Sequence, residues 1–204
     1  MPVNGLGYLL DHMNGSDPIL VVILTSVVWY ALTVPDDFIR QWGDPALYER
    51  AEPITSFDDL LRARAARLCR TLQRGDGAGL AATQVGWLRR LFAFRLSRDD
   101  APDVVVNPHV IWRSEQLATF VEGCLSFNTV AVKVRRPFAV RVAGFDVYGN
   151  YVEFECEDFA ASLMQHEINH LDGILTLHRA DRAERHRAIT VLLSTGGEDL
   201  PRAA

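Results

Sequence analysis

The sequence is poor in cysteine and carries no excess of positive charge. Its 204 residues include only three cysteines, Cys69, Cys124 and Cys156. A small, odd number of cysteines argues against a disulfide framework. The formal net charge is −5, so the chain lacks the basic excess that is typical of nucleic-acid-binding proteins. We therefore expect a cytoplasmic enzyme with no specific nucleic-acid partner. The 49% of hydrophobic residues suffices for one well-buried core.

Lysine and arginine are also missing from residues 1–39, which contain a nearly continuous apolar run from Pro18 to Val34. At 1.5 Å per residue in a helix, this run would span roughly 25 Å, which is marginal for a lipid bilayer. Asp11 and Asp17 precede the run, whereas a secretory signal begins with positive residues. Three interpretations of residues 1–37 stay open. They are an extension that is disordered or arises from a mis-assigned start, a segment packed on the domain, and membrane association of residues 18–34.

The pattern of apolar residues indicates one α+β domain over residues 38–193, with a disordered tail at 194–204. Ser56-Phe57-Asp58-Asp59 resembles a capping box, and it opens a helix whose apolar positions recur at helical spacing as far as Leu72. Asp146–Asn150 is typical of a hairpin connection. Short apolar segments are predicted as strands: Leu91–Arg95, Val104–Val106, Ala118–Val121, Ala131–Val134, Phe138–Phe145 and Tyr151–Glu157. A short helix is expected over Ala183–Leu193. This order predicts antiparallel strands packed around a central helix.

The most informative motif is His166-Glu167-Ile168-Asn169-His170, inside a predicted helix from Asp158 to Asp172. Residues i and i+4 lie on one face of a helix, so the two imidazoles can bind one divalent metal ion. The glutamate between them is placed to act as a general base. Asp158 is a candidate N-cap, and Gly173 is a candidate left-handed C-cap. Taken alone, so short a pattern also arises by chance.

The third ligand distinguishes the classes of metal enzyme. A metzincin protease would place a histidine where this chain has Thr176, and His178 comes two residues later. A gluzincin would use a glutamate on a later helix, and only Glu184 and Glu198 remain. The ligand is therefore sought upstream, where Cys124 would complete a Cys-His-His set with an open fourth position. Taken singly, Cys124 would more often be a buried small hydrophobic residue.

Three segments together resemble the ordered motifs of peptide deformylases, which remove the formyl group from the N-terminal methionine of nascent chains. They are Gly77–Gln84, Glu122–Ser126 and Gln165–Gly173, and they occur in the family's order with family-like spacing. A glycine-rich run alone would suggest no more than a tight turn before a strand. The resemblance covers roughly residues 38–193, and it implies a metal-dependent hydrolase of formyl-methionyl peptides, acting near the ribosome exit.

The resemblance also implies how a metal ion would be held and used. Cys124, His166 and His170 would bind one divalent ion, Fe(II) in the cell, with Zn(II), Ni(II) and Co(II) also compatible with these ligands. Glu167 would take a proton from the activated water and deliver it to the leaving amine.

The same resemblance implies the contacts to the substrate. The side-chain amide of Gln84 and the backbone N–H of Leu125 would donate to the oxyanion that forms during hydrolysis. The glycines of the motifs would let the backbone approach the substrate closely. The substrate-binding residues would be Gly77, Gly79, Leu80 and Gly123.

The chain departs from the family pattern at three places. Asn169 stands where deformylases usually have Asp, so we expect a weaker clamp with its expected partner, Arg136, because an amide forms no ion pair. Phe127-Asn128-Thr129 replaces a proline-containing turn, which predicts a looser rim. Ala131 stands where some members have an arginine near the substrate.

Two functions remain open from the sequence. The favoured one is an active metal-dependent deformylase, which the set of Cys124, Glu167 and Gln84 supports. The alternative is a weakly active or inactive deformylase-like protein that binds peptide N-termini or a partner, and the changes at Asn169 and at the rim favour it.

Overall fold

The computed structural model describes residues 38–195 except Asn128. The predictions for residues 1–37 and 196–204 therefore lie outside the described residues, and so does the apolar run from Pro18 to Val34. Among the residues described, no helix is long and apolar enough to cross a membrane.

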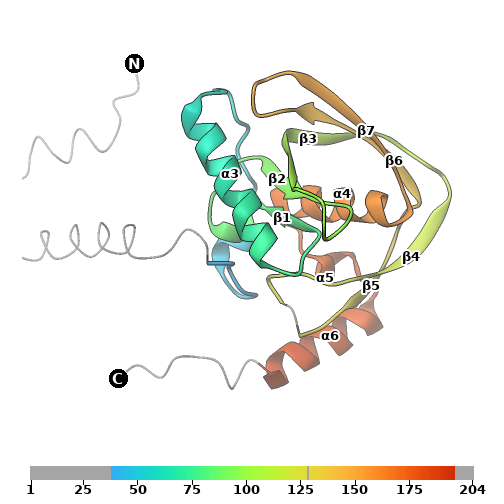
Figure 1. Cartoon of the computed structure of the whole chain (residues 1–204). Helices are drawn as coiled ribbons and strands as arrows, with labels where there is room; N and C mark the ends of the chain where they lie inside the picture. The colour runs from blue at the N-terminus through green and yellow to red at the C-terminus, as the bar shows by residue number, and fades with distance from the viewer. Residues whose placement is uncertain (1–37, 128, 196–204) are drawn as a thin grey trace, which may run out of the picture. The chain divides into compact units, whose positions relative to one another are not determined.

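The main layer is a five-stranded antiparallel sheet in the order β1-β2-β3-β6-β7 (Figure 1). A second, two-stranded sheet pairs β4 with β5, also antiparallel. The strands are β1 (Gly79–Ala81), β2 (Leu91–Phe94), β3 (Asp103–Arg113), β4 (Leu117–Glu122), β5 (Val132–Pro137), β6 (Ala139–Phe145) and β7 (Tyr151–Glu157). The mixture of helices and antiparallel strands confirms the predicted α+β class.

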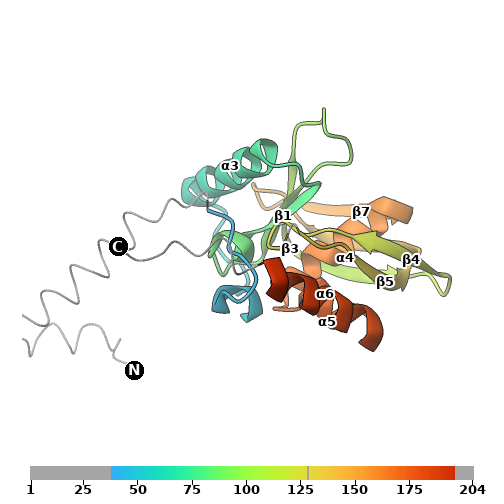
Figure 2. The ribbon, with the colours of Figure 1, turned by 90° about the horizontal axis from the view of Figure 1, so that it is seen from below.

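Helices pack against both sheets. They are the 3-10 helices η1 (Pro45–Tyr48) and η2 (Ala82–Val85), and the α-helices α3 (Asp59–Arg74), α4 (Asp158–Leu171), α5 (Thr176–Arg179) and α6 (Arg182–Thr195). Figures 1 and 2 both show α4 between the five-stranded sheet and the β4–β5 pair. The last helix ends at Thr195, slightly beyond its predicted end at Leu193.

Side chains alternate between the two faces of the strands, so the core around β2 is divided into one cluster against α3 and another against α4. In β2, Leu91 and Ala93 pack in one cluster with α3, while Phe92 and Phe94 pack in another with α4. The two faces of the sheet are thus covered by different helices, each through its apolar stripe. This places α4 in the interior, and every residue of it from Ala161 to Leu171 is buried.

Both predicted N-caps are wrong. The cap of α3 is Asp58, whose carboxylate accepts a hydrogen bond from the Leu61 backbone N–H at 2.9 Å, so the helix begins after the Ser56 expected to cap it. In α4, Glu157 occupies the cap position and Asp158 is the first helical residue, with no side-chain cap. The reason is that β7 ends at Glu157 and α4 begins at Asp158, which leaves no loop to supply a cap.

The predicted glycine at the end of α4 does adopt the left-handed conformation. Gly173 has φ of +71°, and the Ile174 N–H that follows it donates to the Asn169 carbonyl at 2.9 Å. A Cβ at this position would lie 2.4 Å from the Tyr48 carbonyl oxygen.

We therefore expect Gly173→Ala to lower the free energy of unfolding by at least about 1–2 kcal/mol, the cost of left-handed backbone for an L-residue, because the contact with Tyr48 adds to it. Urea denaturation measures this. The matched control is Gly75→Ala, since Gly75 also follows a helix but has φ of −91° and only ordinary contacts around its Cβ position. Equal stability of the two variants would contradict the prediction.

Candidate metal centre

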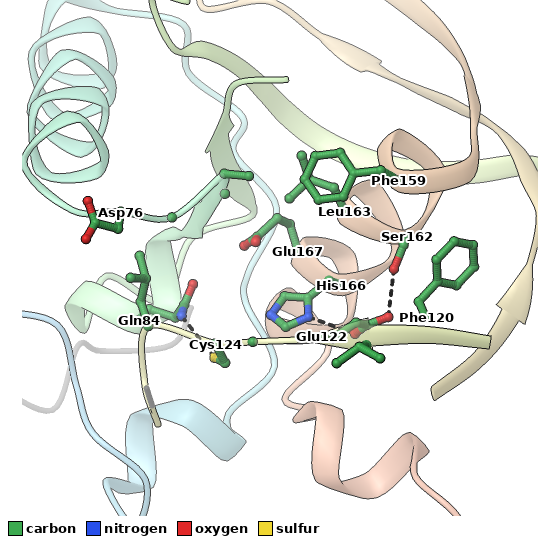
Figure 3. Close-up of a pocket in the computed structure, with 16 residues that line it drawn as sticks. Asp76, Gln84, Phe120, Glu122, Cys124, Phe159, Ser162, Leu163, His166 and Glu167 are labelled. Atoms are coloured by element: carbon green, nitrogen blue, oxygen red, sulfur yellow. Dashed lines mark hydrogen bonds and ion pairs between the residues drawn. The ribbon is translucent and has the colours of Figure 1, made fainter. Parts of the chain in front are cut away.

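Three segments that are distant in sequence bring the predicted site residues together (Figure 3). The buried helix α4 carries His166, Glu167 and His170. Cys124 follows the end of β4, and Gln84 lies in η2, directly after β1. Figure 3 shows Gln84, Cys124, His166 and Glu167 around the same cavity.

The ligand atoms of Cys124, His166 and His170 fit one metal ion. They all lie within 4.8 Å of one another, and all three residues are buried. The Cys124 Sγ is 3.3 Å from His170 Nε2, which is 3.2 Å from His166 Nε2. Separations of this size are expected for ligands about 2.0–2.3 Å from a common tetrahedral ion. A thiolate with two imidazoles suits Zn(II) and the neighbouring divalent transition metals.

Donors from Gln84 and Ser126 surround the sulfur. The Gln84 Nε2 donates to Ser126 Oγ at 3.1 Å and approaches Cys124 Sγ at 3.6 Å, while the Ser126 N–H lies 3.4 Å from the same sulfur. The Ala81 N–H donates to Gln84 Oε1 at 2.8 Å and so fixes which end of the amide faces the sulfur. The N–H groups of Gln84 and Ser126 therefore face the atom through which a cysteine binds a metal ion.

A buried ion pair supports His166 from behind. The Glu122 carboxylate accepts from Arg136 through Nε at 2.5 Å and Nη2 at 2.8 Å, and it lies 3.0 Å from His166 Nδ1. Ser162 Oγ donates to it at 2.8 Å. A carboxylate at Nδ1 leaves Nε2 as the nitrogen that faces His170 and the candidate metal position.

The sequence prediction about Arg136 agrees with the geometry, whereas Glu122 and Ser162 were not predicted to have these roles. Arg136 Nη1 donates to Asn169 Oδ1 at 2.8 Å, so the neutral amide keeps a hydrogen bond to the arginine. Burial alone would raise the pKa of Glu122, but hydrogen bonds and charge from Arg136 and His166 lower it to about 2. The carboxylate is therefore ionised at neutral pH.

Burial alone would lower the pKa of His166, but hydrogen bonds with Cys124 and Glu122 raise it to about 10. For His170 and Glu167, burial is the dominant effect. It lowers the pKa of His170 well below its usual value, so this imidazole is neutral and able to bind a metal. It raises the pKa of Glu167 to about 7. Within the described part of the chain, Glu167 Oε2 and His170 Nδ1 are buried polar atoms without a hydrogen-bond partner. A partner-free carboxylate oxygen beside the ligands is unusual in a core, and it is explained if it faces a reactant.

The cavity in front of these residues has a volume of about 460 Å³. Gly77, Gly79 and Gly123, which were predicted to bind substrate, line it together with Leu125. Leu80 differs, because its side chain is fully buried in the core cluster that contains α3. Any contact of Leu80 with a ligand would therefore involve its backbone.

The glycines have different surroundings. A Cβ on Gly79 would lie 2.3 Å from Glu167 Oε1, so this glycine makes room for the glutamate. A Cβ on Gly77 would lie 2.7 Å from the side chain of Leu125, whereas one on Gly123 would meet nothing within 4 Å. A Cβ would therefore displace Glu167 at residue 79, would require only the end of the Leu125 side chain to move at residue 77, and would fit at residue 123.

The other departures from the motif pattern that the structure describes, at Phe127, Thr129 and Ala131, are not among the residues that line the cavity. Phe127 is buried, and its N–H donates to the Cys124 carbonyl at 3.1 Å, so the turn after the cysteine is closed without proline. Asn128 lies outside the described residues, so the predicted looseness of the rim is untested. The Ala131 carbonyl accepts from Arg187 Nη2 at 2.6 Å.

Comparisons with known proteins point to one family. The family model of polypeptide deformylase matches residues 37–186. The peptide deformylase of Thermotoga sp. (strain RQ2) is 40% identical over 147 residues, 72% of this chain and 88% of that protein. Peptide deformylase 1 of Corynebacterium glutamicum is 40% identical over 158 residues, 76% and 92% of the two chains.

Solved structures agree. The crystal structure of the Thermotoga maritima peptide deformylase has a TM-score of 0.67 at 38% identity, covering 70% of this chain and 96% of that one. The Synechococcus elongatus peptide deformylase in complex with actinonin has a TM-score of 0.72 at 31% identity, covering 78% and 86% of the two chains.

Proposed function

The chain belongs to the polypeptide deformylase family and is a hydrolase that removes the N-formyl group from N-terminal methionine, and we propose that α4 is its metal-binding helix. The observation that carries this proposal is the convergence of three ligand atoms within 4.8 Å beside Glu167, whose Oε2 has no hydrogen-bond partner among the described residues. The catalytic domain is residues 38–193, the compartment is the cytoplasm, and the substrates are formyl-methionyl peptides near the ribosome exit. Fe(II) is the proposed cellular metal.

Glu167 moves the proton in this proposal. Cys124, His166 and His170 would hold a divalent cation, which would supply Lewis acidity that lowers the pKa of a water toward about 7. Glu167 would accept the proton of the attacking water as the water oxygen attacks the formyl carbon. It then gives the proton to the methionine nitrogen as the C–N bond breaks, releasing formate and a free amine. The raised pKa of Glu167 suits a group that both accepts and donates.

Gln84 and Leu125 bind the oxyanion. The Gln84 Nε2 already points to the sulfur side of the site, and its Oε1 is held by the Ala81 N–H. The Leu125 N–H has no acceptor in the part of the chain that the structure describes, so it is free to donate. Two such donors aimed at one oxygen stabilise negative charge as it develops.

Apolar side chains on the cavity wall suit a methionine side chain. Phe120, Leu125, Phe159 and Leu163 line the cavity with the site residues. Methionine is unbranched and adapts to irregular apolar surfaces.

The alternative, a weakly active protein that only binds peptide N-termini, depends on the change at Asn169. The 2.8 Å hydrogen bond between Arg136 and Asn169 supports the active enzyme.

Turnover with and without metal tests the function. We expect the protein purified anaerobically to hydrolyse formyl-Met-Ala-Ser, chelation to abolish the activity, and Fe(II) or Ni(II) to restore it. Cys124→Ala should lose bound metal, measured by elemental analysis, because it removes one of the ligands. Cys156→Ala is the matched control, since Cys156 is equally buried but lies outside the ligand group. No turnover with metal demonstrably bound would favour the binding protein.

Gly79→Ala should lower kcat by about a hundredfold or more with the metal retained, because a Cβ would displace the Glu167 carboxylate. Steady-state kinetics and metal content measure the two effects. Gly75→Ala, in the same segment but with no close neighbour at its Cβ position, should keep the activity of the unaltered protein. If both variants have the same kcat, the close approach of Gly79 and Glu167 has no catalytic role.

A further inference from the structure

A second cavity lies behind α4. Its volume is about 320 Å³, and Gln165, Ile168, Asn169 and Asp172 of the α4 segment line it. At about 100° per residue, these positions fall on the face of the helix opposite His166, Glu167 and His170. The cavity therefore has no residue in common with the substrate cavity.

Besides Val110 and Pro137, the remaining wall of this cavity is formed by arginines from three elements. Arg113 comes from the end of β3, Arg135 and Arg136 from β5, and Arg179 from the end of α5. The charge of Arg136 is matched by Glu122.

The other charges of the wall do not balance. Asp172 forms an ion pair with Arg90 at 2.7 Å, so its carboxylate does not neutralise the arginines of the cavity wall. For Arg113, Arg135 and Arg179, the structure of residues 38–195 shows no ion pair or hydrogen bond of the guanidinium group. The cavity consequently presents three unmatched positive charges.

Asn169 adds a hydrogen-bond donor to the same wall. A guanidinium group only donates, so its bond to Arg136 requires Oδ1 of the amide to face the arginine. The Nδ2 is then the remaining polar atom of a side chain that is 8% exposed, and no described residue accepts from it. An aspartate here would present an anionic oxygen in place of this donor. Gln165 adds no donor, because its amide hydrogens go to the Pro137 and Ala161 carbonyls.

We propose that this cavity binds a phosphate group, either as inorganic phosphate or as part of a small phosphomonoester. Planar guanidinium groups pair with phosphate oxygens through two parallel hydrogen bonds, and an amide N–H completes the donor set. The volume of about 320 Å³ leaves room for an organic group beside the phosphate.

Calorimetric titration of the metal-loaded enzyme with inorganic phosphate, and separately with phenyl phosphate, tests the proposal. We expect binding that Arg135→Gln weakens about tenfold or more, the fold-change of one charge-assisted hydrogen bond. Asn169→Asp should weaken it as well, because the donor becomes an anion. Tighter binding of phenyl phosphate would identify a phosphomonoester as the ligand, and tighter or equal binding of inorganic phosphate would identify the free ion.

Arg141→Gln is the matched control. Arg141 is an exposed arginine of β6 that pairs with Glu155 and does not line this cavity, so its removal changes the net charge equally. The metal content of each variant reports whether its site is intact. The proposal is overturned if millimolar phosphate does not bind, or if Arg141→Gln weakens binding as much as Arg135→Gln. Binding that neither Arg135→Gln nor Asn169→Asp alters would place the anion at the metal and would also overturn it.

Discussion

Replacing Glu167 with glutamine should lower kcat for a formyl-methionyl peptide by about 10²–10⁴-fold, the usual contribution of a general base, while the metal stays bound. Glutamine fills the same space but cannot accept a proton at neutral pH. Glu167 is 2% exposed and has a carboxylate oxygen without a partner in the described structure, whereas the Glu122 carboxylate of the same cavity is already paired with Arg136.

Steady-state turnover and elemental analysis of the same sample measure the loss of kcat and the retention of metal. The matched control is Glu115→Gln, the same change at an exposed glutamate between β3 and β4. A Glu167→Gln enzyme with nearly full kcat would exclude the proposed base. Loss of both metal and activity would show that Glu167 is needed to form the site.

Replacing Arg136 with methionine should lower the free energy of unfolding by about 3–5 kcal/mol, because it leaves the buried Glu122 carboxylate without its cation. The same change removes the donor to Asn169, so the contacts of α4 through both Glu122 and Asn169 weaken. Metal affinity should fall by about 10–100-fold, the usual effect of losing a group that orients a ligand.

Urea denaturation and metal titration measure these effects. Arg141→Met is the matched control, since its ion pair with Glu155 is largely exposed and such pairs contribute little. The double variant Arg136→Met/Glu122→Gln should recover part of the lost stability, because the uncompensated charge is gone. A double variant less stable than Arg136→Met alone would show that the cost is not one of buried charge.

Elements with a regular apolar pattern could be predicted from the sequence, and those with irregular backbone could not. The strand Tyr151–Glu157 and its hairpin connection follow from alternation and from the positive φ of Gly149. The pattern indicated only Val104–Val106 of β3, because register shifts after Val106 and Val110 interrupt its alternation. The three-residue β1 is too short to have a pattern of its own.

The residues that bind the proposed metal could be predicted because each lies in a local motif, whereas their supports depend on tertiary contacts. One signal for the buried ion pair was present in the sequence. Val132, Val134 and Arg136 alternate along β5, and their shared burial places the arginine side chain inside. A buried arginine needs an anion, and Glu122 lies on the strand paired with β5. Which glutamate it meets could not be known before the strands were paired.

The direct passage from β7 into α4 has a consequence for how the protein can change. Because no loop separates Glu157 from Asp158, the end of β7 determines the direction in which each side chain of α4 points. One residue inserted at this junction would rotate every later position by about 100° and carry both histidines away from Cys124. An insertion or deletion at this junction would therefore separate the proposed ligands. The end of an edge strand such as β7 would otherwise be expected to tolerate such changes.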